Sequence, residues 1–317
     1  MITVLAGGVG AARYLSGLVQ VVPPAEVVAV VNTGDDLTLH GLRICPDLDT
    51  LTYTLAGAAD PAAGWGLAGE SWQVMGALER FTPVAPPGSE AGATWFRLGD
   101  ADLATHLYRS ARLAEGADLA TVTEEVAAAW GVAVRLLPMT CDPVQTRLTV
   151  PGEGEIAFQD YFVRRRHSVA VVAVRVEGVD GARPGPGVLG ALDGADRVVI
   201  APSNPVLSIA PILEVPGIGE RLAARREDVV AVSPIVAGAA LKGPADRLLS
   251  ELGGEASVVG VARAWSPVAG TLVVDEADAG LAAAVEAEGV SCVVAPTVMH
   301  GPAEAAALAR VTLAPGA

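Results

Sequence analysis

The chain has 317 residues, 51% of them hydrophobic, and a formal net charge of −15 at pH 7. This length suits one large α/β domain or a core with a smaller insertion, and the acidic balance argues against nucleic acid as the main partner. Without an apolar run of about 18 residues or a signal-peptide pattern, we expect a cytoplasmic protein with no membrane span.

The first fifty residues predict a β-α-β unit. Residues 2–6 and 27–31 are short apolar runs typical of buried parallel strands, and residues 11–20 have apolar side chains at helical spacing. A right-handed crossover places the carboxyl ends of both strands at one edge of the sheet. The glycines at 7–10 and the polar residues at 32–36 should therefore lie side by side, where open α/β sheets bind ligands.

Residues 51–131 interrupt this pattern. Helices are expected at 51–58, 70–80, 103–115 and 121–130, and the Pro/Gly-rich segment 82–93 predicts a loop. We interpret this segment as a mostly helical insertion.

Strand and helix signals alternate again from residue 132, so residues 1–50 and 132–317 are predicted to form one core. Strands are expected at 132–137, 147–150, 155–158, 169–175, 197–200, 229–232, 257–261, 272–274 and 292–295. Helices are expected at 189–193, 209–213, 244–251, 279–288 and 303–309.

Gly8-Val9-Gly10-Ala11-Ala12-Arg13 almost matches a dinucleotide fingerprint, but Arg13 replaces the third glycine. Asn32 also follows the second strand, where an acidic residue should bind ribose, which argues against an NAD(P) site. A phosphate or nucleotide at the helix N-terminus, near Arg13, is the better interpretation. Lys242, the chain's only lysine, is a further candidate for contacting phosphate.

Four acidic residues, Asp35, Asp36, Asp47 and Asp49, are the strongest candidates for chemistry, because carboxylates this close repel unless a cation or hydrogen-bond donors compensate them. We expect them to share Mg²⁺. The alternative is that Asp35 and Asp36 occupy a solvated turn and that Asp49 caps a helix beginning near residue 50.

Other polar segments support a binding role less specifically. Ser203-Asn204-Pro205 and Ser233 follow two predicted strands, where they suit hydrogen bonds to a base or ribose and also suit ordinary turns. Trp95 and Arg97 place an aromatic ring beside a cation, which fits either a ligand contact or a packed loop. Among the histidines, only His40, between the two acidic pairs, is expected near the chemistry.

The chain resembles the 2-phospho-L-lactate transferase family of deazaflavin coenzyme F-420 biosynthesis. The combination of Pro46-Asp47-Leu48-Asp49-Thr50 with Pro202-Ser203-Asn204-Pro205 is specific, whereas neither segment is so alone. Further matching segments are the glycines of residues 7–10, residues 31–36, Arg97-Leu98-Gly99-Asp100, Ala104-Thr105-His106, Phe158-Gln159-Asp160, Ser208-Ile209, Pro211-Ile212, residues 232–235 and Gly243-Pro244-Ala245.

This resemblance implies an α/β fold with a Rossmann-like three-layer core, a mostly parallel sheet and a small all-α insertion that forms part of a deazaflavin pocket. It also implies a homodimer and a Mg²⁺-dependent enzyme. The reaction would transfer a phospholactyl or phosphoenolpyruvyl group from a guanosine diphosphate adduct to the ribityl hydroxyl of the deazaflavin precursor Fo, releasing GMP.

The residues divide into four expected sets, some of which overlap. Asp49 and Arg97 are expected to contact Fo, together with Asn32, Thr33, His40 and Trp95. The nucleotide set is Gly8, Gly10, Arg13, Ser203, Asn204, Pro205, Ser233 and Lys242. The catalytic set is Asp35, Asp36 and Asp49, and the metal set is Asp35, Asp47 and Asp49, so the division between proton acceptor and metal ligand stays open.

The chain departs from the family pattern at one place, and one alternative function shares the same core. The family has two acidic residues where this chain has Cys141-Asp142. The rival is a nucleotide-sugar-binding regulator of the gluconeogenesis-factor type, which shares the core; the segment around Trp95 and Arg97 favours the transferase, because a regulator needs no flavin pocket.

Overall fold

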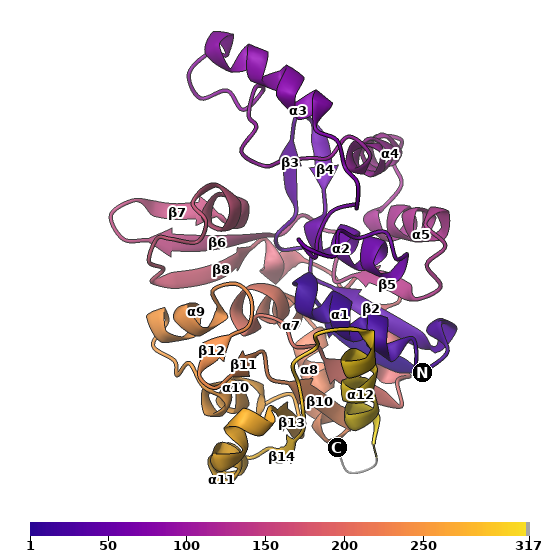
Figure 1. Cartoon of the computed structure of the whole chain (residues 1–317), viewed down its shortest axis with the longest axis vertical. Helices are drawn as coiled ribbons and strands as arrows, with labels where there is room; N and C mark the ends of the chain where they lie inside the picture. The colour runs from indigo at the N-terminus through magenta and orange to yellow at the C-terminus, as the bar shows by residue number, and fades with distance from the viewer. Residues whose placement is uncertain (315–317) are drawn as a thin grey trace.

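The computed structural model describes residues 1–314. Its centre is a seven-stranded sheet in the order β14-β13-β10-β9-β1-β2-β5, with every neighbouring pair parallel (Figure 1). The strands are β1 (Ile2–Ala6), β2 (Val27–Val31), β5 (Arg135–Pro138), β9 (Arg197–Ile200), β10 (Val229–Val232), β13 (Thr271–Val274) and β14 (Ser291–Val294). The predicted α/β fold with a mostly parallel sheet is confirmed.

Helices cover both faces of this sheet because its strands are apolar on both sides. Val4 packs into one core while the next residue, Leu5, packs into the other. One face is covered by α1 (Gly8–Leu18), α2 (Pro46–Leu55), α5 (Leu119–Ala129) and α12 (Pro302–Leu313). The other carries α6 (Val188–Asp193), α7 (Ala210–Glu214), α8 (Ile218–Ala224), α9 (Ala245–Glu251), α10 (Val258–Trp265) and α11 (Ala282–Ala287).

One predicted strand is wrong. Residues 257–261 were expected in the sheet, but they begin helix α10, with the Ser257 hydroxyl accepting hydrogen bonds from the backbone N–H groups of Val259 and Gly260. A short apolar run fits a buried strand or a buried helix equally well, and here the serine cap decides for the helix.

A smaller antiparallel sheet, β7-β6-β8, lies beside the main sheet (Figure 1). Its strands are β6 (Gln145–Val150), β7 (Gly154–Ala157) and β8 (Ala173–Glu177), and two hairpins are formed by β3 (Leu37–Leu39) with β4 (Leu42–Ile44) and by β11 (Ile235–Val236) with β12 (Ala239–Ala240). His40 and Gly41 both have positive φ, 54° and 77°, as the tight turn of the first hairpin requires.

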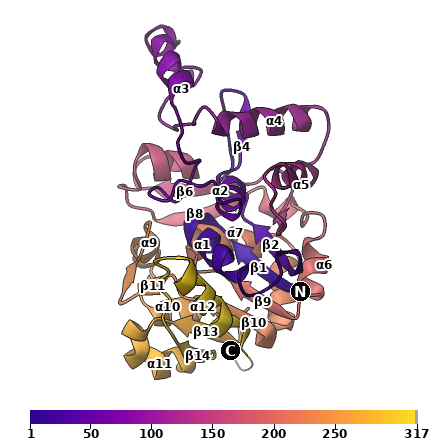
Figure 2. The same ribbon diagram turned by 45° about the vertical axis from the view of Figure 1, so that its right-hand side comes forward.

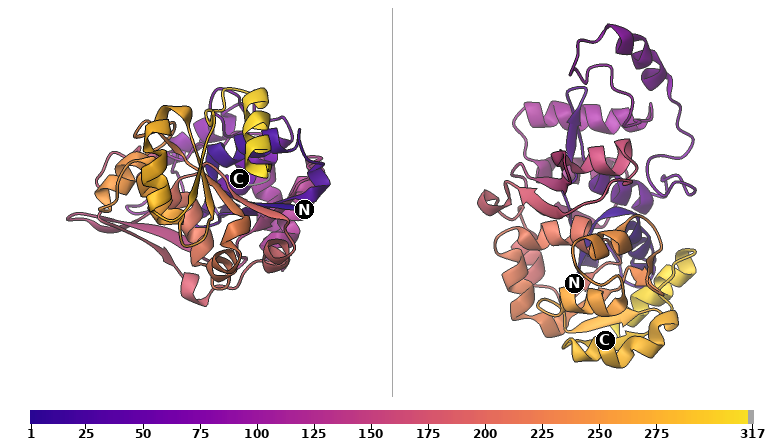
Figure 3. Two further views of the ribbon diagram at one scale, coloured as in Figure 1. Left: turned by 90° about the horizontal axis from the view of Figure 1, so that it is seen from below. Right: turned by 90° about the vertical axis from the view of Figure 1, so that its left-hand side faces the viewer.

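Above the sheet, the chain extends into an arm (Figure 2). The arm consists of α3 (Gln73–Leu78) and a 3₁₀ helix, η2 (Glu79–Val84), with their flanking loops, and α4 (Asp102–Ala114) lies between it and the core. Figure 3 (right) shows the arm at the opposite end of the molecule from the carboxyl terminus.

Short helical turns complete the chain. They are η1 (Pro24–Glu26), η4 (Val179–Gly181), η6 (Arg226–Asp228) and η7 (Glu276–Leu281), and the two π-helical turns η3 (Asp160–Arg164) and η5 (Pro205–Ile209).

Strand order reverses between β1 and β9: the chain proceeds outward from β1 through β2 to β5, and from β9 through β10 to β14. Parallel α/β sheets bind ligands in the crevice at such a reversal, beyond the carboxyl ends of the strands. The loops after β1, β2, β9 and β10 all open there.

Candidate active site

A cavity of about 870 Å³ occupies this crevice. It is lined by the glycine-rich loop after β1, the first turn of α2, the loops after β9 and β10, the segment before α12, and side chains of α4. The predicted site residues along its wall are Gly8, Gly10, Arg13, Asp35, Asp47, Asp49, Arg97, Ser203, Asn204, Ser233 and Lys242.

The glycine-rich loop is packed too closely for side chains. A Cβ atom at Gly10 would lie 2.1 Å from the carbonyl oxygen of Pro202, and one at Gly7 would lie 2.8 Å from a carboxylate oxygen of Asp47. Gly8 has a positive φ of 70°, and its backbone N–H donates to Asp47 Oδ1 at 2.7 Å. The loop therefore holds the start of α1 directly against the acidic residues of α2.

Asp35 and Asp47 form a buried acidic pair. The side-chain amide of Asn32 donates to Asp35 Oδ1 at 3.4 Å and to Asp47 Oδ2 at 3.1 Å. Burial raises the pKa of Asp47 to about 7, although its hydrogen bonds from Asn32 and Gly8 act in the opposite direction. Burial and then the neighbouring Asp47 charge raise the pKa of Asp35 well above its ordinary value.

This acidic pair fits a divalent cation. Each residue is 6% exposed, both line the cavity, and the donors beside them are neutral amides rather than cations. Carboxylate oxygens are the ligands that Mg²⁺ prefers. Among residues 1–314, however, no cluster of three or more acidic, histidine or cysteine side chains has the arrangement of a complete metal site.

Asp49 has a different environment, although it stands only two residues from Asp47. Arg109 of α4 donates to both of its carboxylate oxygens, through Nη1 to Oδ2 at 3.2 Å and through Nη2 to Oδ1. The guanidinium is 2% exposed and also donates to the carbonyl oxygen of Arg43. Asp49 therefore already has a cationic partner.

A chain of polar side chains continues from Arg109 along α4. His106 Nδ1 lies 3.3 Å from Arg109 Nη1, and His106 Nε2 lies 3.0 Å from Asp102 Oδ2. The Tyr53 hydroxyl donates to Asp102 Oδ1 at 2.7 Å. Because residues 102, 106 and 109 are spaced at i, i+4 and i+7, they share one face of the helix, directed toward Asp49.

Asp36 does not line the large cavity. It accepts hydrogen bonds from Arg43 at 2.9 Å and from the Cys45 thiol at 3.0 Å. Burial raises its pKa to about 6, while the Arg43 charge acts against this shift. Neither Asp36 nor Asp35 occupies a solvated turn, so that alternative is wrong. Asp49 is not a helix cap either, since α2 begins at Pro46.

Three cations reach the large cavity. Arg13 has no hydrogen bond or ion pair from its guanidinium to the residues that the structure describes, and its charge lowers the pKa of Lys242 after the larger effect of burial. Lys242 Nζ donates to the carbonyl oxygen of Ala63 at 2.7 Å. The Arg97 guanidinium lies 4.1 Å from the centre of the Trp72 ring. Two neighbouring cations in an acidic protein suit an anionic ligand.

The polar residues after β9 and β10 make local hydrogen bonds as well as lining the cavity. Asn204 Oδ1 accepts from the backbone N–H groups of Val206 and Leu207, and the Ser233 hydroxyl bonds to the backbone of Ile235. The Ser203 hydroxyl is buried and has no partner within residues 1–314, so it is available to a ligand. Pro205 is buried in η5, outside the cavity wall.

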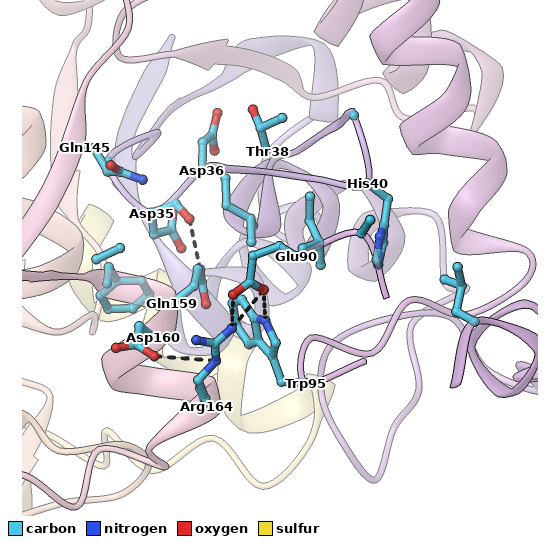
Figure 4. Close-up of a pocket in the computed structure, with 18 residues that line it drawn as sticks. Asp35, Asp36, Thr38, His40, Glu90, Trp95, Gln145, Gln159, Asp160 and Arg164 are labelled. Carbon is cyan, nitrogen blue, oxygen red and sulfur yellow. Dashed lines mark hydrogen bonds and ion pairs between the residues drawn. The ribbon is translucent and has the colours of Figure 1, made fainter. Parts of the chain in front are cut away.

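His40 and Trp95 lie at a second cavity of about 610 Å³, beneath the arm. Figure 4 shows Glu90, Trp95 and Arg164 joined there, with Arg164 and the Trp95 indole both donating to the Glu90 carboxylate. Asp35 lines both cavities, whereas Asn32 and Thr33 are buried behind them and line neither. The six residues expected around Fo are thus divided among different places.

A family model described as 2-phospho-L-lactate transferase CofD matches residues 2–297. The chain belongs to this family. The matched range contains every predicted site residue along the wall of the large cavity, from Gly8 to Lys242, and also Arg109.

Relatives of the CofD family match the chain along nearly its whole length. Proteins named phosphoenolpyruvate transferase from Streptomyces griseus and Kitasatospora aureofaciens are each 44% identical to it, covering 98% and 99% of this chain and 97% of each relative. One of the same name from Mycolicibacterium smegmatis is 41% identical, covering 98% of this chain and 97% of that relative.

Solved structures support the fold. A UPF0052-family protein from Bacillus halodurans has a TM-score of 0.62 and 16% identity, covering 99% of this chain and 98% of that one. A second structure of that protein gives a TM-score of 0.60 at 16% identity, with 99% of both chains covered.

Two features of this CofD member were not apparent from its sequence. Arg109, His106, Asp102 and Tyr53 were not assigned to the site, although three of them carry the i, i+4, i+7 spacing of one helix face. Cys141, which replaces an acidic residue of the family pattern, lines neither cavity, and Asp142 pairs with Arg183 at the surface.

Proposed function

We propose that this CofD-family enzyme transfers a phosphoenolpyruvyl or phospholactyl group from a guanosine diphosphate adduct to the ribityl hydroxyl of Fo, releasing GMP. The observation that carries this proposal is the full-length similarity, at up to 44% identity, to phosphoenolpyruvate transferases. Because the relatives named above share that name, we infer that the phosphoenolpyruvyl adduct is the preferred donor.

The large cavity supports this proposal through its charges. Arg13 and Lys242 lie with the glycine-rich loop at one part of the wall, where the phosphates of the donor would bind. The unpartnered Ser203 hydroxyl and the Asn204 side-chain amide would contact the nucleoside. The helical segment contributes Arg97 and the side chains of α4, where we place the deazaflavin.

In this mechanism the ribityl oxygen attacks the phosphorus atom that bears the three-carbon acid. A new P–O bond forms, the P–O bond to GMP breaks, and the hydroxyl proton leaves for a carboxylate. Asp35 and Asp47 would hold Mg²⁺. When bound, this ion would supply positive charge that stabilises the negative charge developing on the leaving GMP. Arg13 and Lys242 keep the phosphate chain in place for in-line attack.

The division into a core of residues 1–50 and 132–317 and an insertion of residues 51–131 remains part of this proposal, as do the cytoplasmic location and the homodimer. No helix among residues 1–314 is long and apolar enough to cross a bilayer. Light scattering of the purified protein would test the dimer.

A mass-spectrometric assay tests the reaction. The protein is mixed with Fo, Mg²⁺ and the guanosine diphosphate adduct of phosphoenolpyruvate or, separately, of phospholactate. We expect a new acidic deazaflavin species and an equal amount of GMP, with faster turnover of the phosphoenolpyruvyl donor. Binding of nucleotide without product from either donor would contradict the proposal and would favour the regulatory role considered from the sequence.

A further inference from the structure

The acidic residues of the site fall into two electrostatic classes. Asp35 and Asp47 have only neutral amide donors close by, whereas Asp49 has the buried guanidinium of Arg109 on both carboxylate oxygens. A carboxylate that is already paired with a cation has little remaining charge to offer a metal ion. The same geometry leaves lone pairs on Asp49 free, because a carboxylate has about four acceptor positions and the arginine fork uses two.

Asp49 lines the same cavity as Tyr53, Arg97 and His106, and His106 Nδ1 lies 3.7 Å from its Oδ2 atom. Resting on the proposed function, we propose that Arg109 is a positioning residue: its bidentate pairing orients Asp49 as the hydrogen-bond acceptor for the ribityl hydroxyl, and leaves Asp35 and Asp47 as the cation ligands. The substrate class at Asp49 is therefore an alcohol rather than a metal ion.

Arg109 is in turn held in place from several sides. The Nδ1 atom of His106 lies 3.3 Å from Arg109 Nη1 and 3.7 Å from Asp49 Oδ2, and its Nε2 atom lies 3.0 Å from Asp102 Oδ2. The carbonyl oxygen of Arg43 accepts from the same Nη1 atom at 3.4 Å. With Tyr53 donating to Asp102, the chain of hydrogen bonds is complete from Tyr53 to Asp49.

This arrangement gives the predicted insertion of residues 51–131 a role in positioning Asp49. Asp49 belongs to α2, which packs on the core, while Arg109, His106 and Asp102 belong to α4. Bidentate pairing fixes the plane of the carboxylate as well as its charge. The hydroxyl acceptor therefore takes its orientation from the segment that also forms the proposed deazaflavin pocket.

The test is a double-mutant cycle of Arg109→Gln, Asp49→Asn and the variant with both changes, with Arg112→Gln as the matched control. Arg112 lies on the same helix but pairs with Glu115 and Glu125 at the surface. We expect Arg109→Gln to lower kcat about 100-fold, the cost of a misplaced catalytic group, without changing the KM of the guanosine adduct. The double variant should be no slower than Asp49→Asn, because Arg109 acts through Asp49.

Two kinetic results would overturn the inference. One is near-normal turnover of Arg109→Gln. The other is a double variant whose kcat falls below that of Asp49→Asn by the same factor that Arg109→Gln alone produces. Removing Arg109 leaves a buried charge, so that variant can fail to fold. The double variant avoids this problem because it removes both charges. Arg109→Lys is measured beside it: the lysine keeps the positive charge but cannot make the bidentate pair, so its kcat should also fall.

A second measurement separates this inference from the proposed function. If the wild-type protein forms no product, the proposed function fails, and the five variants are compared by the fluorescence change of Fo on binding. The inference then requires Arg109→Gln and Asp49→Asn to weaken Fo binding equally, and the double variant to weaken it no further. Unchanged Fo affinity in Arg109→Gln would overturn it. Magnesium binding, followed by calorimetry without substrate, should persist in Asp49→Asn; its loss there would also overturn the assignment.

Discussion

Lys242 Nζ donates a hydrogen bond to the carbonyl oxygen of Ala63 at 2.7 Å, joining the loop after β12 to the loop that follows α2. A Cβ atom on the adjacent Gly64 would lie 3.0 Å from a methyl group of Val9, so the second loop rests on the glycine-rich loop. The chain's only lysine thus connects two segments at the part of the cavity where we propose that the donor phosphates bind.

We predict that Lys242→Met weakens binding of the guanosine diphosphate adduct by about 10-fold or more, because a charge-assisted hydrogen bond to phosphate is lost. Isothermal titration calorimetry measures this directly. Arg310→Met, which removes an exposed cation of α12, is the control and should bind normally. Equal affinity of the Lys242→Met protein and the wild type would show that the lysine only joins the two loops.

Gly10→Ala should destabilise the protein by about 2 kcal/mol or more, because the new methyl group would lie 2.1 Å from the Pro202 carbonyl oxygen and force the two loops apart. Urea unfolding measures the change. Gly76→Ala in α3 is the control, since its methyl group would meet no atom within 4 Å and should add up to about 1 kcal/mol of helix stability. Similar effects of both changes would contradict the close packing at Pro202.

Asp35→Asn should stabilise the protein in the absence of metal, on the order of 2 kcal/mol, while abolishing turnover. The reason is that burial and the Asp47 charge both disfavour an ionised Asp35, and an amide of the same shape removes those costs. Thermal unfolding with and without Mg²⁺ would show a higher Tm and no stabilisation by the ion. Asp180→Asn, at an exposed position, should change neither. A lower Tm for Asp35→Asn would argue against electrostatic strain at this pair.

Arg164→Gln should loosen the arm without unfolding the core. Arg164 donates twice to Glu90, at 2.7 and 2.8 Å, and its guanidinium lies 4.4 Å from the centre of the Trp95 ring. Because the pair is partly exposed, we expect a stability change below about 1 kcal/mol but faster hydrogen exchange around residues 73–95. Arg175→Gln, which breaks a similarly exposed pair with Glu155, is the control. Unchanged exchange in the arm would contradict the prediction.

The sequence predicted the parallel core well because short apolar runs alternate along the chain with segments of helical pattern, as in a β-α-β arrangement. The apolar runs at 197–200 and 229–232 coincide with β9 and β10, and the acidic residues after β2 and in α2 meet at the expected edge. The prediction at 257–261 failed because Ser257-Val258-Val259-Gly260-Val261 is too short to carry a period that separates a strand from a helix.

The site was only partly predictable, since nearness in sequence suggested one cluster of four carboxylates. Asp36 instead pairs with Arg43, and Asp49 with Arg109, which is sixty positions away along the chain. A partner at that distance depends on how α4 packs on the core, and no local pattern encodes that. His40 was expected near the chemistry for its position between the acidic residues, yet the hairpin turn carries it to the smaller cavity.

Asp35, Phe158 and Gln159 face both cavities, and the Gln159 side-chain amide donates to the backbone carbonyl oxygen of Asp35 at 2.9 Å. The partition between the two spaces is therefore a single layer of side chains. A compound anchored under the arm that displaced Gln159 would reach Asp35 and Asp47 from the smaller cavity, without competing for the glycine-rich loop where we propose that the donor phosphates bind. Inhibitors of this design would not be overcome by high concentrations of the nucleotide substrate.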